Sequence, residues 1–185
     1  FERGNASYWI GHHHCTEREY EKAEINWREY LEDAKHLSSI DPKNPKWKHE
    51  QSYALNSLGS LSLRTGENRE AIDLFKESLR LKNDALSMQP GNIDIEYDII
   101  DSASWISSTE ESIGNLHGAS TGYESQIEDL KSLIAANSER ATWNLRLANL
   151  LMLAVMTAGA WTLYQDKIPL EVFQDMPSRY ISVNV

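Results

Sequence analysis

The sequence repeats at a spacing of 48 residues, and this repeat constrains the fold more than any other feature of the chain. Small residues, alanines, aromatic residues and aliphatic residues each recur in register, without gaps. A unit of this size buries its apolar residues by stacking on its neighbours, so the repeat predicts an array of helical units. The recurring columns are Ile10, Leu58, Ile106 and Ala154; Gly11, Gly59 and Ser107; Ala23, Ala71 and Ala119; Trp27, Phe75 and Tyr123; and Leu31, Leu79 and Ile127.

The clearest unit is YALNSLGSLSLRTGENREAIDLFKESL, residues 53–79. Gly59 and Ala71 are small where two helices would cross, and Phe75 fills the space beside them. Gly66 can take a positive φ in the turn. The spacing L-G…A-x3-F resembles the tetratricopeptide repeat, in its long-helix variety because 48 residues exceed the usual 34. The resemblance implies an all-α fold, a right-handed superhelical solenoid of antiparallel helix pairs with about three and a half repeats.

The repeat also predicts where the helices and the domain end. In the fourth unit Lys167 and Glu171 stand where an alanine and an aromatic residue recur, and Val155 replaces the small residue. We therefore expect one repeat domain over residues 1–165 and an irregular or extended tail over residues 166–185. The predicted helices lie at about 1–16, 19–39, 46–65, 68–87, 93–113, 117–137 and 139–164.

The charge of the chain limits the classes of partner, and its cysteine content limits the disulfides that it can form. The formal net charge is −10, the pI is near 5.0, and no run is rich in Lys and Arg, which argues against a nucleic-acid partner. Cys15 is the only cysteine, so no internal disulfide is expected. A cytoplasmic location fits this, and a periplasmic one stays open. The chain begins with Phe1, and by the resemblance we interpret it as the repeat portion of a larger bacterial-type signalling, regulatory or assembly protein.

Several columns of the first helix in each unit are polar in most units, which apolar packing does not explain. In the tetratricopeptide family these positions line a concave groove that holds a peptide or protein segment. The resemblance therefore implies a non-enzymatic interaction scaffold with a partner-binding groove. The expected groove residues are Asn5, Tyr8, His12, Tyr53, Asn56, Ser60, Arg64, Asp101, Ser104, Ser108 and Glu111.

One groove type of the family is not expected here. Members that bind chaperones hold a C-terminal carboxylate with Lys, Asn and Arg at set positions of the first helices. The equivalent positions are Tyr8 and His12 in the first unit and Asp101 and Trp105 in the third. Only Asn56 fits the pattern, so a carboxylate clamp is unexpected.

The stretch GHHHC, residues 11–15, has the composition of a metal site but not its geometry. Successive helical residues point about 100° apart, so only His12 and Cys15 share a face. We expect these two to line the groove and His14 to pack towards the partner helix. No CxxC, HExxH, phosphate loop or catalytic triad pattern is present, so neither a metal, a cofactor nor an enzymatic activity is expected. A thiol or metal activity at His12 and Cys15 is the least favoured alternative.

Residues 147–165 form a stretch of nineteen residues without a formal charge, which approaches the length of a membrane span. The stretch is in register as the first helix of the fourth unit, with Leu151 and Ala154 in core columns. Burial is therefore favoured over membrane insertion. The alternative function is a homo-oligomerisation module that associates through this unit, with Met152 and Met156 as the contact residues.

Overall fold

The structure is a computed structural model that describes residues 2–137 and 141–165, and within these residues it is all-helical. The helices agree with the predicted ranges to within two residues at each end. The predicted tail, residues 166–185, lies outside the described residues. The helices are α1 (Glu2–Thr16), α2 (Tyr20–Ile40), α3 (Pro45–Thr65), α4 (Asn68–Met88), α5 (Ile93–Ser112), α6 (Leu116–Ala136) and α7 (Ala141–Gln165).

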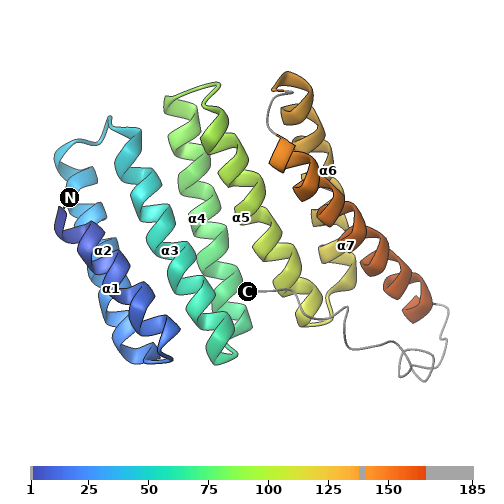
Figure 1. Ribbon diagram of the computed structural model, residues 1–185, viewed down its shortest axis with the longest axis horizontal. Helices are drawn as coiled ribbons and strands as arrows, with labels where there is room; N and C mark the ends of the chain where they lie inside the picture. The colour runs from blue at the N-terminus through green and yellow to red at the C-terminus, as the bar shows by residue number, and fades with distance from the viewer. Residues whose placement is uncertain (1, 138–140, 166–185) are drawn as a thin grey trace.

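The helices stand side by side as a row of antiparallel hairpins (Figure 1). In this view α1, α3, α5 and α7 lie nearer the reader and α2, α4 and α6 lie behind them. All the extensive contacts between helices join elements that are consecutive in the sequence. The contacts are therefore local along the chain, as the 48-residue period predicts.

The turn between the two helices of a pair has the same geometry in each of the first three units. Gly66 and Gly114 take φ values of 86° and 83°, and the equivalent residue of the first unit, Arg18, takes 61°. Gly66 ends α3 and its N–H bonds to the carbonyl of Leu63, as expected for a left-handed residue after a helix. The prediction of a positive φ at Gly66 is confirmed. Arg18 adopts a conformation that costs a side-chain-bearing residue about 1 kcal/mol or more.

The small and aromatic columns meet in the core. A Cβ atom on Gly11 would lie 2.7 Å from the Trp27 ring, and one on Gly59 would lie 2.7 Å from the Phe75 ring. The alanines of the neighbouring column are fully buried in all three units. The first two hairpins are therefore each held together by an aromatic ring packed directly on a helix backbone.

In the third unit different residues form the contact between the two helices. Ser107 replaces the glycine, and its hydroxyl accepts a hydrogen bond of 2.9 Å from the Gln126 side chain. Room for it comes from Gly122 on the facing helix, where a Cβ would lie 2.1 Å from the Ser107 oxygen. Tyr123 still fills the aromatic position and is fully buried.

Two positions of the apolar columns are more exposed than their equivalents. Leu58 is 3 % exposed, whereas Ile10 is 47 % exposed, because Leu58 faces the preceding unit and no described unit precedes Ile10. Leu151 is 42 % exposed although its equivalent Leu55 is buried, so the expectation that Leu151 is a core residue is wrong. The reason is that no described helix packs on this side of α7. Ala154, which was also expected in the core, is partly buried and packs against it.

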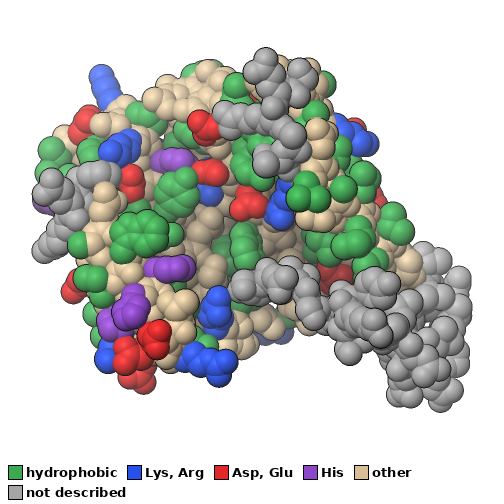
Figure 2. All heavy atoms as spheres, in the orientation of Figure 1, with side chains coloured by type: hydrophobic (Ala, Val, Ile, Leu, Met, Phe, Trp, Pro, Cys, Tyr) green, Lys and Arg blue, Asp and Glu red, His purple; other side chains and the backbone are tan. Residues whose placement is uncertain are grey.

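The expected burial of residues 147–165 is thus only partly seen. Leu150 and Thr157 are fully buried, but Met152, Val155 and Met156 are between 43 % and 71 % exposed. Side chains coloured as hydrophobic are correspondingly crowded along α7 (Figure 2). No helix in the described part of the chain is long and apolar enough to cross a membrane.

The contact between Gly59 and Phe75 can be tested by one added methyl group. Gly59→Ala should lower the free energy of unfolding by about 1–3 kcal/mol, because the new Cβ overlaps the Phe75 ring. The control is Gly159→Ala in α7, where nothing lies within 4 Å of the added atom. Higher helix propensity should make that variant more stable by about 0.5–1 kcal/mol. Urea unfolding measures both, and a Gly59→Ala protein as stable as Gly159→Ala would contradict the packing argument.

Candidate functional site

A groove with a volume of about 660 Å³ lies on the face formed by α1, α3 and α5. The same face is hollowed over these helices in Figure 2, with hydrophobic and histidine side chains gathered beside the hollow. Trp27 of α2 forms part of the lining from below, between α1 and α3. The lining residues are Tyr8, His12, Cys15, Thr16, Trp27, Tyr53, Asn56, Ser57, Ser60, Leu63, Arg64 and Trp105.

The groove brings together six of the eleven groove residues predicted from the sequence, and it also contains Cys15 as expected. The other predicted residues lie on the same helices but outside its lining. The residues in the lining are Tyr8, His12, Tyr53, Asn56, Ser60 and Arg64; those outside it are Asn5, Asp101, Ser104, Ser108 and Glu111.

Aromatic contacts shape the groove. The Trp27 indole donates a hydrogen bond of 3.2 Å to the Tyr8 carbonyl, which joins α2 to α1 beneath the opening. The Trp105 ring stacks on Phe75 with centroids 6.0 Å apart. Tyr8 packs edge-on against Tyr30. These rings are held by the core, so the walls of the groove are preformed.

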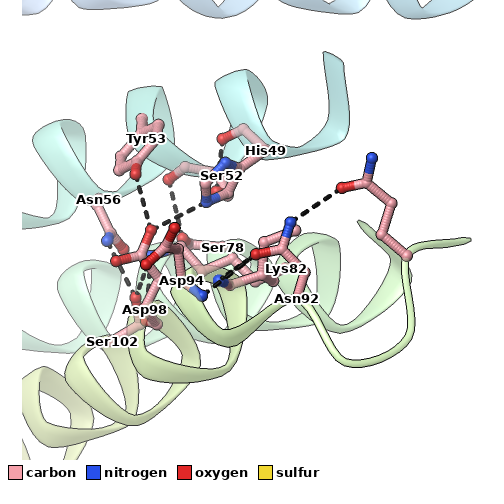
Figure 3. Close-up of polar contacts among 12 residues, drawn as sticks. His49, Ser52, Tyr53, Asn56, Ser78, Lys82, Asn92, Asp94, Asp98 and Ser102 are labelled. Carbon is pink, nitrogen blue, oxygen red and sulfur yellow. Dashed lines mark hydrogen bonds and ion pairs between the residues drawn. The ribbon is translucent and has the colours of Figure 1, made fainter. Parts of the chain in front are cut away.

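The polar columns have a role that the sequence argument did not assign to them. The Tyr53 hydroxyl donates a hydrogen bond of 2.7 Å to the Asp98 carboxylate, and Asn56 donates one of 3.1 Å to Ser102. Figure 3 shows these side chains of α3 pointing towards α5. Each bond joins the first helix of one unit to the first helix of the next. The Asn56 amide oxygen is buried and has no hydrogen-bond partner among the described residues.

The third and fourth units are joined in the same way. Arg146 of α7 donates to Asp101 at 2.6 Å and also to the hydroxyl of Ser104. Glu111 accepts hydrogen bonds from Tyr123 and Thr157, at 3.1 and 3.0 Å. Polar residues in these columns can therefore be explained by hydrogen bonding between helices.

The helices α1 and α3 differ from the later pairs. No hydrogen bond joins a side chain of residues 4–16 of α1 to one of α3, whereas α3–α5 and α5–α7 are bridged. The groove opens at this unbridged step of the array.

A buried lysine that sequence reasoning missed anchors α4 to α5. Lys82 is 2 % exposed, and its ammonium donates to the Ser102 hydroxyl at 2.6 Å and to the Asp98 carbonyl at 3.2 Å. Its nitrogen also lies 5.3 Å from the centroid of the Tyr53 ring. Burial lowers the pKa of Lys82, and nearby carboxylates oppose this effect. The repeat could have predicted the burial of Lys82, because the residues at the equivalent positions of the other units, Ala34 and Leu130, are apolar and buried.

Asp98 is the centre of this cluster (Figure 3). Its carboxylate accepts hydrogen bonds from Tyr53 and from His49, the latter at 3.0 Å. Burial alone would raise the pKa of Asp98, but these hydrogen bonds and the charge of Lys82 together hold it below its usual value. Burial and the bond to Asp98 raise the pKa of Tyr53. The Tyr53 hydroxyl and the Lys82 ammonium thus hold α3, α4 and α5 together.

The described part of the chain contains no group of three or more His, Cys, Asp or Glu side chains that could hold a metal ion. His12 and Cys15 lie in the groove lining, as predicted. The His14 ring lies 2.5 Å from the Glu19 carboxylate, at the turn that leads into α2. His12 and His14 therefore have different surroundings.

The role of the Asp98 carboxylate predicts a pH-dependent loss of stability. Asp98→Asn should cost about 1–3 kcal/mol at neutral pH. Because the folded pKa lies below the unfolded value of about 3.9, this contribution is present above that value and is lost as the pH falls through the folded pKa. The difference in urea stability from the native protein should thus shrink between about pH 5 and pH 3. Asp73→Asn, at an exposed position of α4, is the control, and an equal deficit for Asp98→Asn at both pH values would contradict this role.

The sequence was compared with known protein families and with curated proteins. No protein-family model matches the chain, and no curated protein matches it.

Proposed function

We propose that this protein is a non-enzymatic interaction scaffold that binds a peptide or protein segment in the groove between α1, α3 and α5. In this proposal the helical hairpins form a right-handed, tetratricopeptide-like solenoid. The observation that carries the proposal is the groove itself, which gathers aromatic and uncharged polar side chains from three units on a rigid base. Such a surface supplies apolar contact area together with a few hydrogen-bonding groups.

The dimensions of the groove suit a short extended segment. Tyr53 and Arg64 mark its extent along α3 and are eleven residues apart, which corresponds to about 16 Å of helix. About five residues of extended chain span that distance. Tyr53 and Asn56 bond to a neighbouring helix. The polar side chains of the lining that make no such bond among the described residues are Tyr8, His12, Thr16, Ser57, Ser60 and Arg64.

Filling the groove tests this function without breaking the contacts between helices. Ser60→Trp should block a bound segment, because Ser60 lines the groove and carries no bridging hydrogen bond. Asp73→Trp, at an exposed position of α4 outside the groove, is the matched control. Proteins captured from a lysate of the source organism should be retained by the native protein and by Asp73→Trp and lost by Ser60→Trp. Retention of the same proteins by all three would refute the groove as the binding surface.

The exposed face of α7 favours oligomerisation as a second candidate function. Val155 is equivalent to Gly11 and Gly59, the residues on which the second helix of a unit packs. In α7 this position is 71 % exposed, and Gly159 on the following turn has no neighbour within 4 Å. The face that receives a second helix in each earlier unit is therefore open in the described structure.

A second copy of the chain is a suitable occupant of this face. Residues 147–161 carry no formal charge, so two α7 helices can approach although each chain carries a net charge of −10. Met152 and Met156 flank the open face and adapt to an irregular partner surface.

Charged substitutions on α7 test this second candidate. If α7 mediates association, the native protein should show a mass in sedimentation equilibrium that rises with concentration, and Met152→Glu with Val155→Glu should be monomeric. Ile25→Glu is the control, because Ile25 of α2 is also 59 % exposed but lies far from α7 in the array. A native protein that is monomeric at every concentration would exclude self-association through this helix.

A further inference from the structure

The groove differs in charge from the rest of the molecule. The chain has 28 acidic and 18 basic residues, yet none of the twelve residues that line the groove is Asp or Glu. Arg64 is the one lining residue with a permanent charge. We infer that the groove selects a peptide segment in which an Asp or Glu side chain lies within about five residues of an aromatic or large aliphatic side chain. This inference rests on the proposed function and specifies its ligand class.

Arg64 is available to such a carboxylate. It is exposed and has no ion pair or side-chain hydrogen bond with any described residue, whereas Arg28, Arg80 and Arg146 are each paired with a carboxylate. It lies in the last turn of α3, where the helix dipole favours a cation. A guanidinium can receive the carboxylate through two parallel hydrogen bonds, which fixes the orientation of the ligand as well as its position.

The apolar part of the ligand has defined places to bind. Trp105 and Tyr8 are partly exposed in the groove, and Tyr53 is 38 % exposed. Ser57 and Ser60 lie between Tyr53 and Arg64 on α3, and their small side chains leave the middle of the groove open. A ligand whose carboxylate is at Arg64 therefore reaches the aromatic rings with its neighbouring residues.

The overall charge of the protein does not override this local preference. A net charge of −10 repels an acidic peptide at long range, but screening limits that effect to about 8 Å at physiological salt. A basic peptide is drawn to the acidic outer faces, yet it meets no carboxylate in the groove. Binding of the acidic segment should consequently depend weakly on salt, because salt weakens both the contact with Arg64 and the long-range repulsion.

Selection from a displayed library of random heptapeptides tests the ligand class. The native protein should enrich peptides with Asp or Glu within five positions of Trp, Tyr, Phe or Leu. For a selected peptide made synthetically and labelled, fluorescence anisotropy should show about tenfold weaker binding to Arg64→Gln. Replacing the acidic residue of the peptide with its amide should have the same effect on the native protein and little further effect on Arg64→Gln. Arg69→Gln, at an exposed position outside the groove, should bind like the native protein.

The outcomes separate the ligand class from the proposed function. One outcome is that Ser60→Trp blocks the binding of the selected peptides, but the peptides show no acidic enrichment or bind Arg64→Gln equally well. That outcome would overturn the ligand class and leave the groove as a peptide site. Basic peptides whose binding falls steeply with salt and ignores Arg64 would also overturn it. Failure to select any peptide that Ser60→Trp blocks would overturn both.

Discussion

The structure depends on one kind of contact, an aromatic ring packed against a helix backbone at a position that has no side chain. Trp27 on Gly11 and Phe75 on Gly59 bring the two helices of a hairpin together so closely that a single added carbon atom would overlap the ring. In the third unit the glycine is on the other helix, where Gly122 leaves room for the Ser107 side chain. Because Trp27 also lies beneath the groove, the contact that closes the first hairpin positions a wall of the candidate site.

A second set of interactions joins the hairpins to one another. Lys82, Asp98 and Arg146 form hydrogen bonds between units, and Tyr53, the donor to Asp98, lies on the face that carries the groove. Polar side chains on this face therefore divide into those that connect helices and those that remain accessible. The groove lies mainly at the step between α1 and α3, and Tyr53 and Asn56 of its lining also bridge α3 to α5.

The two candidate functions use different surfaces and are compatible. The groove is a concave surface with polar groups and one unpaired cation, as suits a short segment of another chain. The open face of α7 is apolar and uncharged, and it corresponds to the contact within a hairpin. A partner there would complete the fourth unit in place of a second helix.

The sequence by itself determined the helices, their boundaries, the turn at Gly66 and the pairing of small with aromatic residues, because these follow from contacts within one unit and recur every 48 residues. Six of the eleven groove residues predicted from the sequence also line one groove in the structure. Only the tertiary structure decided which polar residues bridge units, since Tyr53–Asp98 and Asp101–Arg146 are each 45 residues apart. A repeat reports the residue type at each position but not whether a neighbouring unit supplies its partner. For the same reason the exposure of Ile10 and Leu151, at the two ends of the described array, could not be derived from their columns.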